Sequence, residues 1–137
     1  MSATETGDSN KNAWFGAGAE YTLASSEGDG KQNVAVGVAS QYYIEDGINN
    51  TSLGSGSLLY NVNGNENTAI GSSALMGVQF KDVNGCTTIG AGSAFVNSAD
   101  NITAIGTYAL ANNTGCYNTA LGFNNMHDNL NGMSNTS

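Results

Sequence analysis

The chain has 137 residues, no proline, two cysteines and a formal net charge of −8. Eleven carboxylates stand against three lysines and no arginine, which excludes the basic surface that nucleic acids and anionic membrane leaflets require. No stretch approaches the roughly 20 apolar residues of a transmembrane helix, and residues 1–11 lack the basic start and apolar core of a secretory signal. We expect residues 1–11 to be a flexible N-terminal segment or linker.

Asparagine is the commonest residue, with 20 copies, and glycine follows with 19. Only 10% of the chain is charged. Asparagine, glycine, serine and threonine suit many short strands joined by tight turns. The composition therefore favours an all-β fold.

A repeat runs through most of the chain and appears first in the string NAWFG. Seven glycines share one sequence context at spacings of 16 to 21 residues. These repeat glycines are Gly16, Gly37, Gly54, Gly71, Gly90, Gly106 and Gly122. The residue before each glycine is apolar: Phe15, Val36, Leu53, Ile70, Ile89, Ile105 and Leu121.

The three residues before each repeat glycine are β-branched, aromatic or small, as in Thr-Ala-Ile, and this favours a strand. In chain order the expected strands cover 13–15, 34–36, 51–53, 68–70, 87–89, 103–105 and 119–121. Alternation sends the first and third residues to one face and the middle residue to the other. The glycine then bends the chain. A second short strand is expected around the fourth residue after the glycine, which is Leu58, Leu75, Ala94, Leu110 or Met126.

Units of this length are too short for a propeller blade and too poor in helix formers for a helical repeat. They predict a parallel β-solenoid of about seven coils over 12–126, roughly 33 Å long, with 127–137 as a C-terminal tail or linker. Stacked coils would align Asn33, Asn50 and Asn67 in a side-chain ladder. Simple turn preference is the alternative explanation of these asparagines.

Both faces of the Thr-Ala-Ile-Gly strand are apolar or very small, whereas a lone solenoid should have one clearly polar face. One face would line the coil and the other would meet neighbouring chains, and the pattern does not assign which does which. A slender coil has little interior, so association helps to bury surface. We predict a parallel homotrimer that buries the strip of alanine and glycine.

The strings NTAIGSSAL (67–75), ITAIGTYAL (102–110) and NTALGFNNM (118–126) resemble the repeats of trimeric phage tail fibres. They are also similar to the β-roll heads of trimeric autotransporter adhesins. The resemblance covers residues 12–126 and implies a left-handed coil and a trimer. The coils are longer and less even than the adhesin pattern, and no stalk or membrane anchor is evident, so the resemblance favours the fibre.

Residues that could carry chemistry are few. His127 is the only histidine and has no ligand-spaced partner, so a structural or solvated role is expected. The carboxylates considered for a glycosidase pair fall mostly singly in predicted turns of different coils, which disfavours that chemistry; they are Glu45, Asp46, Glu66, Asp82, Asp100 and Asp128. The runs GDG (28–30) and EDG (45–47) lack the spacing of a recognised calcium loop. We expect no catalytic residue, metal site or cofactor, and predict that the chain is not an enzyme.

Tyr42 and Tyr43 lie beside Glu45 and Asp46 in one of the longer connections. Exposed tyrosines near carboxylates can contact a sugar. Alternatively, one tyrosine faces the coil and the other a neighbouring chain. Because the connections vary in length and content, any ligand contacts are expected there and not on the strands.

Cys86 and Cys116 belong to the fifth and seventh units, so two coil steps of more than about 7 Å should separate them. We predict that they do not form a disulfide. Two unpaired thiols suit assembly in a reducing compartment.

Together these features predict a structural or adhesive segment of a viral (phage) tail fibre that spaces or presents a host-receptor-binding surface. Its location would be the virion, and its partners would be two further copies and a host glycan or protein, with no nucleic acid and no membrane insertion. The alternatives are the head of a bacterial trimeric adhesin, at the cell surface, or the subunit of a self-assembling filament.

Overall fold

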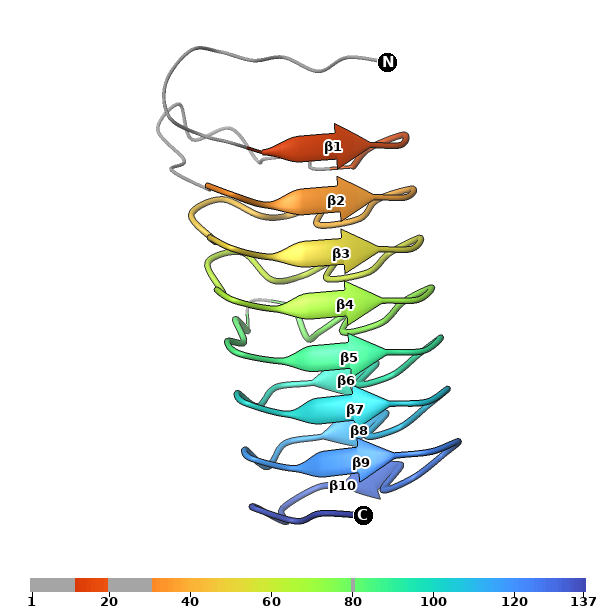
Figure 1. The fold of residues 1–137 in the computed structure, drawn as a ribbon. Coiled ribbons are helices and arrows are strands. Elements are labelled where there is room, and N and C mark those ends of the chain that lie inside the picture. The colour runs from red at the N-terminus through yellow and green to blue at the C-terminus, as the bar shows by residue number, and fades with distance from the viewer. Residues whose placement is uncertain (1–11, 20–30, 80) are drawn as a thin grey trace.

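A computed structural model describes residues 12–19, 31–79 and 81–137. Within these residues the chain forms ten short strands in two parallel sheets. Figure 1 shows the strands stacked one above another along a single axis, with the chain returning behind the front sheet after strands such as β2, β3 and β7. Seven successive strands of the front sheet enclose about six turns. The predicted all-β parallel solenoid is therefore confirmed.

The front sheet contains one strand from every repeat unit. Its strands are β1 (Ala13–Phe15), β2 (Val34–Val36), β3 (Thr51–Leu53), β4 (Thr68–Ile70), β5 (Thr87–Ile89), β7 (Thr103–Ile105) and β9 (Thr119–Leu121). Each strand pairs in register with the next, so that Thr68 lies beside Thr87 and Ile70 beside Ile89. Equivalent residues of successive coils consequently form columns along the axis.

The second sheet lies behind the last coils in Figure 1. It consists of β6 (Val96–Asn97), β8 (Asn112–Asn113) and β10 (Asp128–Asn129). The second strand expected around the fourth residue after each glycine is misplaced. Those residues have left-handed backbone conformations, with φ of 53° at Leu58 and 49° at Leu110, and so turn the chain. The strand begins two residues later, and among the described residues it forms in three units.

The repeat glycines stack directly on one another at a bend. Gly71 has a φ of 130°, a backbone conformation that L side chains rarely adopt. A Cβ atom built on it would lie 2.6 Å from the backbone carbonyl atoms of Gly90 in the next coil. Glycine is therefore required here both by backbone conformation and by the close approach of the coils.

From β2 onward, the middle residue of each front-sheet strand is buried inside the coil. Ala35, Ala69, Ala104 and Ala120 are fully buried, whereas the residues on either side of them are half-buried or exposed. The expected alternation is confirmed, but the prediction that the alanine strip forms the interface between chains is wrong. The strip already lies inside its own coil, where only small side chains fit beside the other inward residues.

The predicted asparagine ladder is present. The backbone N–H of Asn50 donates to Asn33 Oδ1 (2.8 Å), and the backbone N–H of Asn67 donates to Asn50 Oδ1 (3.0 Å). Each side-chain amide also reaches a backbone carbonyl of the following coil, as Asn50 Nδ2 does at Gly64 O (2.8 Å). All three asparagines are fully buried. Their side chains thus replace backbone hydrogen bonds where the coil turns.

This ladder is interrupted at Cys86 and Ile102, which occupy the same column. A second ladder runs through the same coils, because Asn113 Nδ2 donates to Asn97 Oδ1 and Asn129 Nδ2 donates to Asn113 Oδ1, both at 2.9 Å. Cys86 Sγ lies 3.4 Å from Ala99 O, and Asn97 Nδ2 donates to that same carbonyl (2.8 Å). Asn97, a member of the second ladder, therefore bonds the Ala99 carbonyl, which an asparagine at position 86 would otherwise reach.

The interior is more polar in the second and third coils than in the later ones. In the second and third coils, Ser40 Oγ lies 2.5 Å from Ser52 Oγ and 3.0 Å from Ser57 Oγ, and Gln41 Nε2 donates to Ser52 Oγ (2.9 Å). From Leu58 onward an apolar cluster fills the coil. Its larger members are Leu58, Leu75, Val83, Ile102 and Leu110.

Residues 127–137, expected to be a tail or linker, hold β10 and an isolated bridge between Thr136 and Thr119. Asn135 N–H donates to Asn118 Oδ1 (2.9 Å), as in the other rungs of the first ladder. Residues 1–11, expected to be a flexible segment or linker, lie outside the described part of the chain.

Gly71→Val should destabilise the solenoid strongly. Backbone strain at positive φ costs about 1–3 kcal/mol, and the overlap with Gly90 adds about 1–3 kcal/mol. Gly122→Val is the matched control, because Gly122 has a φ of 127° but no atom within 4 Å of its built Cβ. Thermal melting followed by circular dichroism should show a clearly larger loss for Gly71→Val. Equal losses would contradict the stacking of the glycine column.

Asn50→Ala should remove three inter-coil hydrogen bonds, leaving the Asn67 N–H and the Gly64 carbonyl without these partners, whereas Asn67 Nδ2 keeps its bond to Val83 O. Each buried group left unsatisfied costs about 1–3 kcal/mol, so we expect a loss of roughly 2–5 kcal/mol. Asn131, which is exposed, provides the control substitution Asn131→Ala. Chemical denaturation measures both, and a loss for Asn50→Ala no greater than for the control would mean that the ladder contributes little.

Candidate functional site

The outer side of the front sheet is a regular surface that contains residues from all seven front strands. We define the sheet face as the first and third residues of the seven front strands. Its third-residue column includes Leu121 and Leu53, which are 66% and 48% exposed. None of the 14 residues is charged, since the columns contain threonine, aliphatic residues, one alanine and one phenylalanine. An uncharged strip of this length with an exposed aliphatic column indicates a binding surface.

A second uncharged surface lies over the return segment of the coil. We define the second face as Tyr42, Tyr43, Leu59, Tyr60, Met76, Phe95, Val96 and Asn112. Most of these side chains are half-buried, and Val96 is 39% exposed. Backbone hydrogen bonds align successive members of this face. The N–H of Tyr43 donates to Leu59 O, and the N–H of Tyr60 donates to Met76 O.

The candidate ligand tyrosines belong to this second face. The rings of Tyr43 and Tyr60 stack with centroids 5.4 Å apart and an interplanar angle of 15°. Tyr42 meets Tyr43 edge-on at 4.8 Å. Much of the Tyr43 ring surface is therefore engaged with other tyrosines of the same chain, which leaves less of it for a sugar.

Sequence reasoning missed Leu59, Tyr60, Met76, Phe95 and Val96 as members of a surface. The information was in the repeat, because each lies five or six residues after a repeat glycine. Aligning those two columns as carefully as the residues before the glycine would have grouped them. The same alignment, extended by one residue, would have revealed the second asparagine ladder.

Carboxylates of several coils lie in the segments that lead back toward the next front strand. We define the acidic edge as Glu45, Asp46, Glu66, Asp82 and Asp100. Asp82 Oδ1 accepts the backbone N–H groups of Val62 (2.8 Å) and Asn63 (2.9 Å). Asp100 Oδ1 accepts the N–H of Asn84 (2.8 Å). Two of the carboxylates considered for glycosidase chemistry thus hold neighbouring coils together.

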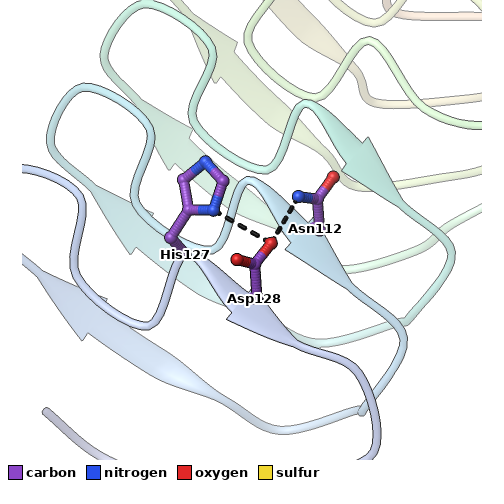
Figure 2. A network of polar contacts seen from close by, with 3 residues as sticks. All are labelled: Asn112, His127 and Asp128. Carbon is purple, nitrogen blue, oxygen red and sulfur yellow. Dashed lines mark hydrogen bonds and ion pairs between the residues drawn. The ribbon is translucent and has the colours of Figure 1, made fainter.

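His127 lies at the C-terminal end of the second face, within the network drawn in Figure 2. Its Nδ1 is 3.0 Å from Asp128 Oδ1, and Asn112 Nδ2 donates to the same oxygen (2.6 Å). These two hydrogen bonds, Asn112's first, lower the pKa of the Asp128 carboxyl. Across 12–19, 31–79 and 81–137, no three His, Cys, Asp or Glu side chains gather as a metal site would require.

Both cysteines are free thiols. Cys86 is buried, whereas Cys116 is half-buried at the turn. Burial raises the pKa of the Cys86 thiol to about 11, and backbone hydrogen bonding at Ile102 opposes this only in part.

No helix in the part of the chain that the structure describes has the length and apolarity to span a membrane. Comparison with protein-family models, with curated proteins and with solved structures finds no match to this chain. The two uncharged faces and the acidic edge between them are therefore the features from which a function can be argued.

The cysteines should react at very different rates in the folded protein. At pH 8 a thiol with a pKa of about 11 is roughly one-thousandth thiolate, and burial further blocks access. Iodoacetamide should therefore modify Cys116 first, as measured by peptide mass mapping. Faster modification of Cys86 would contradict its place inside the coil.

Ionisation of Cys86 favours the unfolded chain, so the stability of the folded protein should fall as the pH rises from about 9 toward 11.

Proposed function

We propose that this chain is a segment of a viral (phage) tail fibre, in which three parallel copies form a shaft that spaces or presents a host-receptor-binding surface. The observation that carries the proposal is the uncharged, exposed sheet face. A single solenoid would leave this apolar strip in water along its whole length, whereas association removes it from solvent.

The distribution of charge allows copies of the chain to pair through the sheet face. The net charge of −8 makes copies repel each other wherever their carboxylates approach. The sheet face carries no carboxylate in any of its seven strands, so copies can meet there without burying like charges. Burying its aliphatic column is favourable at about 25 cal/mol per Å².

The parallel arrangement follows from the repeat, since coils of equal height can then meet coil by coil. Three copies, and the left hand of the coil, are carried by the resemblance to fibre and adhesin repeats. The proposed trimer differs from the one first expected, because the contacting surface is the aliphatic side of the strands and not the alanine strip.

Receptor contacts are proposed for the connections, which differ between units while the strands repeat. One connection, 78–85, contains a bridge between Val78 and Lys81 and an exposed Gln79. Another, before Gly37, extends over 20–30, which lies outside the described residues. The proposed receptor is a host glycan or protein, and the proposed location is the virion.

A self-assembling filament is the second candidate function. The second face favours it, because a chain with uncharged surfaces on two sides can add copies without closing a ring. The measured size of the assembly separates the two functions, as a fibre segment stops at three copies.

Ile89→Asp should dissociate the trimer into folded monomers, because three buried carboxylates without partners would each cost several kcal/mol. Ile48→Asp is the matched control: Ile48 is 37% exposed and Ile89 38%, but Ile48 lies beside the acidic edge. Sedimentation velocity and native mass spectrometry should give a trimer for the parent and the control only. A stable folded monomer of the parent at micromolar concentration would overturn the proposal.

A further inference from the structure

We infer that neighbouring copies pair through two different surfaces, the sheet face of one copy against the second face of the next. This inference rests on the proposed homotrimer. The contact pairs the column of Leu53, Ile89 and Leu121 with the tyrosines, Met76, Phe95 and Val96 of the neighbouring copy.

Symmetry requires two surfaces. Around a three-fold axis each copy contacts both neighbours, and a contact that repeats by rotation joins one patch to a different patch. A single self-complementary patch would produce a two-fold dimer instead. The sheet face therefore needs a partner surface elsewhere on the chain, unless the three copies meet only along the axis.

The second face has the composition of such a partner. Aromatic residues and methionine are enriched at the cores of protein interfaces, where charged residues are depleted. The second face has three tyrosines, a phenylalanine and a methionine, and no charged member. The ring contacts of Tyr43 with Tyr60 and of Tyr42 with Tyr43 hold the aromatic side chains in place before association, which lowers the entropy lost on binding.

The acidic edge is a poor partner for the sheet face. Glu45, Asp46, Glu66, Asp82 and Asp100 would all be brought against threonine and aliphatic side chains. The sheet face has no cation to pair with them, so their desolvation would be uncompensated. Of the three surfaces defined above, this edge is the one that should face solvent.

Rotation about the axis does not shift one copy along it, so each coil meets coils of similar height. The fifth unit places one residue on each face: Ile89, on β5, is 38% exposed and Val96, on β6, is 39% exposed. Both are uncharged and project from strands, so cysteine at either position should leave the coil intact.

The experiment joins these two positions by a short bis-maleimide. Ile89→Cys and Val96→Cys are made singly and together in a Cys116→Ser background, with buried Cys86 retained. Glu66→Cys combined with Ile89→Cys tests the acidic edge. Sedimentation velocity and thermal melting are measured for every variant before cross-linking, and denaturing electrophoresis is used after it.

The expected result is a covalent trimer from the Ile89→Cys and Val96→Cys double variant, and mostly uncross-linked chain from each single variant and from the Glu66→Cys pair. Covalent dimers from Ile89→Cys alone would overturn the inference, because the sheet faces would then meet each other. A trimer by sedimentation in which the double variant fails to cross-link would overturn the pairing and leave the trimer standing. A monomer by sedimentation would overturn both.

Discussion

The hydrogen bonds that join each coil to the next constrain every other feature of this molecule. They hold the front strands in register, so whatever residue occupies one position of the repeat is stacked on its equivalents. At the bend, this spacing leaves no room for a Cβ between successive repeat glycines. At the turns, where backbone groups would lack partners, asparagine and aspartate side chains complete the bonding.

A coil closed in this way has a narrow interior, so the larger side chains of the front strands lie on its outer surface. Alanine, serine and asparagine occupy much of the inside, while isoleucine and leucine of the same strands face outward. Along the front sheet, the small residues are thus buried and many of the larger aliphatic residues are exposed. A surface built of repeated aliphatic columns is the physical basis of the proposed assembly, because no other element in the described part of the chain covers it.

The polar residues have largely structural roles. Asp82 and Asp100 bond backbone N–H groups, and the buried asparagines bond one another. These side chains therefore stabilise the stacking of the coils. The variable connections and the acidic edge are the regions where neighbouring repeats differ most, and recognition commonly resides in regions of this kind.

The repeat by itself determined the solenoid, its front strands and the glycine bend, because each depends on residues that recur at fixed positions in the coil. It also indicated the first asparagine ladder, but only the structure distinguished the ladder from simple turn preference. Which face of each front strand is buried was decided only by the folded coil. The alternation of Thr-Ala-Ile allows either face to point inward, and the narrow interior at these strands accommodates alanine but not isoleucine. The start of the second strand was likewise undetermined, since left-handed bends at Leu58 and Leu110 have no glycine to mark them. The repeat places Tyr43 and Tyr60 in one column, but the stacking of their rings was decided only by the tertiary structure, because it depends on how the side chains turn once the coils are stacked.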